Sequence, residues 1–156
     1  MREILFRGKR KDSCTWIVGH LLKFEDGRAR INESHTDIFC YEKDNSIIQT
    51  IAHEVIPETV GQFTGLTDKN GKKIFEGDLL NGFQYPFYRS ESDEHNYFAE
   101  VIWFTGNCAF GLYTHKHPTA KVRGISAGNA DFIEDFNSDD WEVIGNIYDN
   151  PELVEG

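Results

Sequence analysis

Residues 60–78, VGQFTGLTDKNGKKIFEGD, decide the fold of this chain. Asn70-Gly71 is the favoured pair for a two-residue hairpin, because both central residues of a type I′ turn need a positive φ. Glu76-Gly77-Asp78 then predicts a second reversal before the apolar Leu79-Leu80. The stretch therefore predicts a strand, a tight turn, a second strand, and another turn that leads into a third strand.

Short apolar segments separated by Gly, Asn and Pro continue on both sides of this stretch. Their spacing is typical of an all-β barrel or sandwich, and an aromatic content of 13% favours strands over helices. The best helix candidate is 129–136, where apolar positions recur at helical spacing, and 86–96 predicts a long loop. The predicted strands are 4–6, 14–22, 28–31, 38–41, 47–51, 72–75, 79–83, 99–104, 108–113 and 141–148.

The fold class predicted from these segments is mainly β, with at most one or two short helices. A chain of 156 residues and 17.9 kDa is long enough for one domain, or for two small subdomains sharing a core. Pro57 marks the expected boundary between an N-terminal β subdomain, 1–57, and a second one, 58–156. Strand alternation and side-chain size predict a buried core formed by Trp16, Phe63, Phe75, Val101, Trp103, Phe110 and Ile144.

The block at 61–78 also resembles the YopX family of small phage and prophage proteins. Three shorter pieces, in order along the chain, look like other strands of that family: 2–7 at the start, 99–104 in the middle, and 142–153 at the end. The resemblance, together with the order of turns and strands, implies a small SH3-like barrel in the second half. It carries over no biochemical activity.

The net charge of -10, with a pI near 5.0, disfavours nonspecific nucleic-acid binding, because an acidic surface repels phosphate groups. We therefore expect no nucleic-acid partner. The basic cluster is Arg7, Lys9, Arg10 and Lys11, and we interpret it as a solvated hairpin loop.

Compartment and redox state follow from two further patterns. No apolar run approaches the ~18 residues needed to span a membrane. Charged residues near the start interrupt the apolar segment that a signal peptide requires. The cysteines Cys14, Cys40 and Cys108 are odd in number and far apart, which predicts buried free thiols in a reducing compartment. We therefore expect a protein of the host cytoplasm with no membrane partner.

Three patterns suggest catalytic or metal chemistry, and each is incomplete. Residues 124–128, GISAG, match a nucleophile elbow centred on Ser126, but that site needs a later histidine and the last one is His117. His115 and His117 flank Lys116, so in a strand they supply two metal ligands without a third at diagnostic spacing; the same holds for the pair His35 and Asp37. We therefore predict a glycine-serine loop, surface histidines, and no catalytic, cofactor-binding or metal residue.

The hairpin tip also resembles the start of a calcium loop at Asp68, but Lys72 and Lys73 occupy the positions of a required ligand and glycine. We interpret the segment as a hairpin only.

The densest acidic segment consists of Asp131, Glu134, Asp135, Asp139, Asp140 and Glu142, interleaved with Phe132, Phe136 and Trp141. Carboxylates ringing aromatic anchors suit a protein interface, although the aromatic residues alternatively pin the segment to the fold. The leading functional hypothesis is a non-catalytic binding module whose protein partner docks on this segment. The alternatives are a metal-dependent hydrolase using His115, His117 and a carboxylate, and an acidic decoy of nucleic acid. A homo-oligomer is left open.

Overall fold

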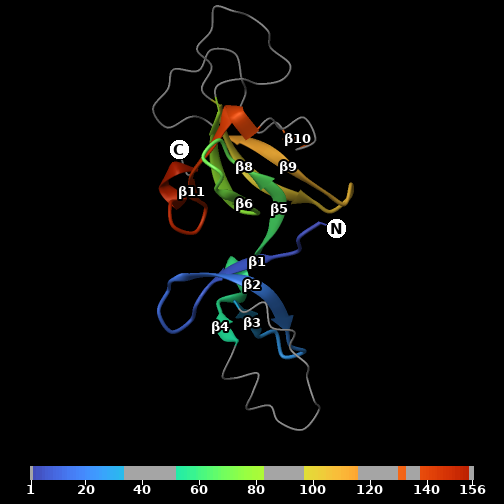
Figure 1. Cartoon of the computed structure of the whole chain (residues 1–156), viewed down its shortest axis with the longest axis vertical. Helices are drawn as coiled ribbons and strands as arrows, with labels where there is room; N and C mark the ends of the chain where they lie inside the picture. Colours follow the sequence, from blue (N-terminus) through green and yellow to red (C-terminus); the bar gives the residue numbers. More distant parts are fainter. Residues whose placement is uncertain (1, 34–51, 83–96, 116–129, 133–137, 155–156) are drawn as a thin grey trace, which may run out of the picture. The chain divides into compact units, whose positions relative to one another are not determined.

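The computed structural model describes residues 2–33, 52–82, 97–115, 130–132 and 138–154 (Figure 1). The chain divides into two compact units, Met1–Phe63 and Thr64–Gly156. The described residues are mainly β, which confirms the predicted fold class, and their helices are three-residue 3₁₀ turns. The predicted strands 38–41 and 47–51 and the predicted loop 86–96 lie outside the described residues.

The first unit is built on antiparallel strands in the order β4-β3-β2-β1, and β1 also pairs with the start of β5. Burial alternates along the first half of β2, since Ile17 is buried while Val18 and His20 are exposed. The core cluster contains Ile17, Ala29, Ile31 and Val55. The elements are β1 (Phe6–Lys9), β2 (Trp16–Lys23), β3 (Ala29–Asn32), β4 (His53–Val55) and the 3₁₀ turn η1 (Pro57–Thr59).

The basic cluster is only partly the solvated loop that we predicted: Lys11 lies in an exposed turn, whereas Arg7 and Lys9 lie on β1. Strand β1 continues through Lys9, and its register places Lys9 opposite Trp16. The Arg7 guanidinium lies 4.8 Å from the centroid of the Trp16 ring, and the Lys9 ammonium lies 5.7 Å from it. Arg7 is buried and Trp16 half-buried, so the aromatic ring and two cations form one packed stack rather than an open basic strip.

The other two basic residues of the cluster are ion-paired. The guanidinium of Arg10 bonds the Asp12 carboxylate at 2.6 Å and holds the pKa of Asp12 at about 2. The Lys11 ammonium lies 3.0 Å from Glu54 of β4, and the backbone N–H of Lys11 donates to the Glu54 carbonyl. The bonds of Lys11 lie at the outer edge of β4, and the two ion pairs offset the positive charges of Arg10 and Lys11.

The second unit contains a five-stranded antiparallel sheet in the order β10-β9-β8-β7-β11. Strand β5 runs into this unit, where it pairs with β6. The sheet is open in the described residues, so the predicted SH3-like barrel is not confirmed. The elements are β5 (Gly61–Thr67), β6 (Lys73–Phe75), β7 (Asp78–Gly82), β8 (Tyr97–Phe104), β9 (Ala109–His115), β10 (Ala130–Phe132), η3 (Ser138–Asp140), β11 (Trp141–Asn146) and η4 (Pro151–Leu153).

Asn70 and Gly71 lie at the tip of the β5–β6 hairpin, as predicted, but the turn is not type I′. Gly71 has a φ of 78°, whereas Lys69 and Asn70 have negative φ values. The Gly71 N–H donates to the Asp68 carbonyl, and the Asp68 N–H donates to the Lys72 carbonyl. The loop is therefore the three-residue kind, a type I turn followed by a left-handed glycine.

The second predicted turn, Glu76-Gly77, is a corner between sheets rather than a hairpin. Strand β6 pairs with β5, whereas β7 lies between β8 and β11. Gly77 has a φ of 81°, and the buried Asp78 carboxylate accepts the Phe75 N–H at 2.8 Å. The corner lets the β5–β6 ribbon pack on the five-stranded sheet.

The core of the second unit lies between that ribbon and the sheet. Trp141 is 3% exposed, and a Cβ on Gly82, its neighbour across β7 and β11, would lie 2.6 Å from its ring. The indole therefore packs directly on bare backbone, which only glycine permits. The cluster contains Ile74, Leu80, Ala99, Val101, Leu112, Trp141 and Val143, with Leu66 packed against it.

Burial confirms part of the predicted core. Phe63, Phe75, Val101 and Phe110 are buried, as predicted. Trp16 is only half-buried and lies outside the core, and Trp103 and Ile144 are 41% and 43% exposed, so the prediction is wrong for these three. The Trp103 ring packs edge-on against Phe110, its cross-strand neighbour near the end of β8. Ile144 sits at a β-bulge between Val143 and Gly145, and the extra residue breaks the two-residue alternation.

The helix predicted at 129–136 is also wrong where the structure describes it. Residues 130–132 form β10, and Ala130 pairs with Tyr113 of β9. Backbone pairing with the edge of β9 outweighs the helical spacing of a few apolar residues, so these residues form a strand. None of the helices in the described segments is long and apolar enough to cross a membrane.

Two cysteines differ from the prediction of buried thiols: Cys14 and Cys108 are free, as predicted, but exposed. Both have positive φ values, 56° and 50°, so each occupies a tight turn rather than a strand interior. Cys40 lies outside the described residues.

Native protein is therefore expected to react with a thiol reagent at Cys14 and Cys108 without denaturant, because exposure controls access of the reagent. Mass spectrometry of the labelled chain gives the sites, and Cys14→Ser and Cys108→Ser should each remove one rapidly labelled position. Labelling of either thiol only after unfolding would contradict the exposed placement.

Candidate functional site

Charge is distributed very unevenly between the two units. Residues 64–156 contain 16 Asp and Glu against 7 Lys and Arg, whereas residues 1–63 contain 10 against 9. Almost the whole negative charge of the chain therefore belongs to the second unit. A field of one sign attracts and orients a partner of the opposite sign.

The acidic segment ends on a rigid support. Asp139 and Asp140 lie on η3, which leads directly into Trp141 of β11. Trp141 is buried, so this aromatic residue attaches the segment to the core and is not an exposed anchor for a partner. Asp131 lies on β10, and Glu134, Asp135 and Phe136 lie outside the described residues.

Strand β11 is an edge of the five-stranded sheet, and the tip of the β5–β6 hairpin covers that edge. The Lys69 N–H donates to the Trp141 carbonyl at 3.0 Å. The Val143 N–H donates to Asp68 Oδ2 at 3.0 Å. The hairpin loop thus meets outward-facing backbone groups of β11 as a neighbouring strand would.

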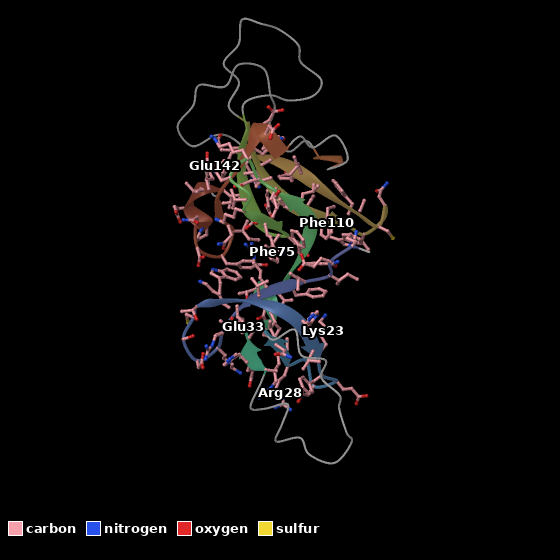
Figure 2. All side chains as sticks on the ribbon, viewed as in Figure 1. Lys23, Arg28, Glu33, Phe75, Phe110 and Glu142 are labelled. Atoms are coloured by element: carbon pink, nitrogen blue, oxygen red, sulfur yellow. The ribbon has the colours of Figure 1, made fainter. Side chains whose placement is uncertain are left out.

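Side chains reinforce the contact between the loop and β11. The Lys69 ammonium lies 2.6 Å from Glu142 Oε2, and the Asn70 amide donates to Glu142 Oε1 at 3.4 Å. Figure 2 labels Glu142 on this strand. A half-exposed ion pair of this kind adds up to about 1 kcal/mol, so the backbone contacts carry most of the specificity.

Asp68 is the centre of this arrangement. Its carboxylate is 3% exposed, and burial alone would raise its pKa. The backbone N–H groups of Val143, Lys72 and Asn70 outweigh that cost and bring the pKa below its usual value. Oδ1 accepts from Asn70 and Lys72, each at 2.9 Å, while Oδ2 accepts from Val143. One oxygen holds the turn and the other holds the edge strand.

A second polar cluster lies on the β8–β9 hairpin. His115 Nε2 lies 2.9 Å from Glu100 Oε2, and both side chains are mostly buried. The Tyr113 ring packs edge-on against the imidazole, with 5.0 Å between ring centroids. Glu100 pairs with Tyr113 in the strand register, which makes His115 its diagonal neighbour. The carboxylate orients the imidazole, as in many general-base and metal sites.

The other residues of the catalytic and metal patterns cannot be placed in the fold. His35, Asp37, His117 and Ser126 lie outside the described residues. Among the residues that the structure does describe, no group of three or more His, Cys, Asp or Glu side chains is placed to hold a metal ion.

Sequence reasoning missed Glu100 and the role of Asp68. The predicted strands 99–104 and 108–113 leave a turn at 105–107, and counting outward from that turn pairs Glu100 with Leu112. The observed turn is one residue longer and pairs Glu100 with Tyr113, so only the structure places His115 diagonally opposite Glu100. The sequence around Asp68 suggests only the start of a calcium loop, and its hydrogen-bond partner Val143 is 75 residues away along the chain. No local pattern reveals such a contact.

Two of three comparisons with known proteins found a match. The sequence pattern described as YopX protein matches residues 5–155. The crystal structure of protein EF1440 from Enterococcus faecalis is similar to this chain, with a TM-score of 0.48 and 20% sequence identity, over 99% of each chain. A search of curated proteins finds no match.

Proposed function

We propose that this chain, which belongs to the YopX family, is a non-catalytic binding module that docks a basic protein partner through its second unit. The observation that carries the proposal is the charge separation, with 16 acidic against 7 basic residues in 64–156. Asp139, Asp140 and Glu142 lie on or beside a strand anchored by Trp141, so their charges are presented without the cost of ordering a loose segment. The setting we propose is phage-related and within the host cytoplasm.

Removing two charges from this surface is expected to slow association with a basic partner. The test variant is Asp139→Asn with Asp140→Asn, and the control is Glu25→Gln with Asp26→Asn, which removes the same charge from the first unit. Association rates of a partner captured from host lysate should fall several-fold for the test variant at low salt and converge with the control near 1 M salt, where the Debye length is about 3 Å. Equal rates for the two variants across the salt series would refute docking on this surface.

The decoy hypothesis is a special case of this proposal, in which the basic partner surface normally binds nucleic acid. Competition distinguishes it, since a DNA fragment should then displace the chain from its partner. The chain itself is expected not to bind duplex DNA at physiological salt, because few counterions would be released.

The pairing of Glu100 with His115 favours the second candidate, a metal-dependent hydrolase, because it supplies a carboxylate beside the histidine. Under the binding-module proposal, the purified chain should contain no stoichiometric metal, since the described part of the molecule offers two of the three or four ligands that zinc requires. Elemental analysis of the wild type and of His115→Ala makes the decision. One zinc per wild-type chain that is lost in the variant would favour the hydrolase.

A further inference from the structure

Strand β11 offers a docking edge that the molecule's own hairpin loop already occupies. The loop presents three groups to β11: the Lys69 N–H to the Trp141 carbonyl, the Asp68 carboxylate to the Val143 N–H, and the Lys69 ammonium to Glu142. A donor, an acceptor and a cation at this spacing are what an added strand carrying a lysine would present.

We propose that the edge of β11 is the docking site for an extended, lysine- or arginine-containing segment of the partner, and that the Asp68–Asn70 loop occupies this edge until the segment replaces it. This inference rests on the proposed function and names its partner chemistry. The loop also protects the edge from unwanted pairing, as natural sheets generally require.

Charge selects a basic segment over a second copy of this chain. Two copies of β11 paired antiparallel through Trp141 and Val143 would place Glu142 opposite Glu142, and like charges directly opposite are destabilising. A basic segment instead meets Glu142, with Asp139 and Asp140 just before the strand.

Asp68→Asn separates the two roles of the carboxylate. The amide oxygen still accepts the Asn70 and Lys72 N–H groups, so the turn persists, while the amide nitrogen faces the Val143 N–H, where two donors meet. The matched control is Asp26→Asn, because the Asp26 carboxylate accepts its hydrogen bonds from Arg28 within the same exposed turn.

The probe is a synthetic peptide of alternating valine and lysine, and its control carries N-methyl groups on alternate backbone nitrogens. Asp68→Asn should bind the peptide about tenfold more tightly than the wild type. A tenfold gain corresponds to weakening the competing contact between the loop and β11 by about 1.4 kcal/mol. Asp26→Asn should match the wild type, and N-methylation should abolish the gain because strand addition needs the backbone N–H groups.

Lys69→Pro provides a second variant with an independent mechanism. Lys69 is the second residue of the type I turn, where proline is favoured, so the turn is retained while the N–H bond to Trp141 and the ion pair to Glu142 are lost. It should also tighten peptide binding, and backbone hydrogen exchange of Val143 in the wild type should be slow, since the loop covers its N–H.

Several results would overturn the inference. Folded Asp68→Asn or Lys69→Pro with unchanged peptide affinity would do so, as would fast exchange of Val143 in the wild type. Self-association of Asp68→Asn without peptide binding would mean that a second copy of this chain, and not a basic segment, docks on the edge of β11. Salt-dependent peptide binding that ignores N-methylation would reject strand addition while leaving electrostatic docking through the second unit intact.

Discussion

Replacement of Trp141 by alanine is expected to lower the free energy of unfolding of the second unit by about 3–5 kcal/mol, the range for a buried aromatic residue. The ring is 3% exposed and fills the core beside Ile74, Leu80 and Val143. Because Gly82 lies directly against the ring, no neighbouring side chain is placed to collapse into the cavity from that side. Urea denaturation followed by circular dichroism measures the loss.

Trp103→Ala is the matched control, since it removes the same side chain from a position that is 41% exposed. It should cost about 1 kcal/mol, mainly through the lost edge-on contact with Phe110. Similar losses for the two variants would mean that the core does not centre on Trp141.

Replacement of Asp68 by alanine is expected to cost about 1–3 kcal/mol at neutral pH, because one buried N–H loses its charged acceptor while the other two N–H groups regain water. The Val143 N–H is the donor that water reaches least easily, since its bond to Asp68 is buried whereas the bonds from Asn70 and Lys72 are part-buried. Thermal or urea unfolding at neutral pH gives the difference, and Asp26→Ala, in an exposed turn, should change stability far less.

The same residue makes the second unit acid-sensitive. Burial raises the pKa of Asp68 in the folded chain, but hydrogen bonds from the N–H groups of Val143, Lys72 and Asn70 outweigh burial. The pKa of Asp68 in the folded chain is therefore below its usual value. A lowered folded pKa contributes stability that is present above the unfolded value near 3.9 and is lost as pH falls through the folded pKa. Asp68→Ala should therefore show a shallower loss of stability below about pH 4 than the wild type. Parallel pH profiles would contradict this role.

Local chemistry alone determined much of this protein. Alternating residues and turn signals in 60–78 predicted the β5–β6 hairpin, its tip at Asn70 and Gly71, and the mainly β class, since these depend on neighbouring dihedral angles and on strand periodicity. The same alternation identified Phe63, Phe75, Val101 and Phe110 as buried. The acidic residues of the candidate docking surface were also visible in the sequence.

Only the tertiary structure decided where those pieces meet. Arg7 and Lys9 are a loop cluster in the sequence and an aromatic stack in the fold, because the register with β2 places Trp16 beside them. Ile144 is apolar yet exposed, because a bulge shifts its side chain out of the alternation. The sequence predicts an ordinary turn residue at Asp68, but in the fold its buried carboxylate accepts a hydrogen bond from the Val143 N–H of the edge strand β11. Each outcome depends on contacts between residues that are distant in the chain, and a local sequence pattern does not show which distant residues will meet.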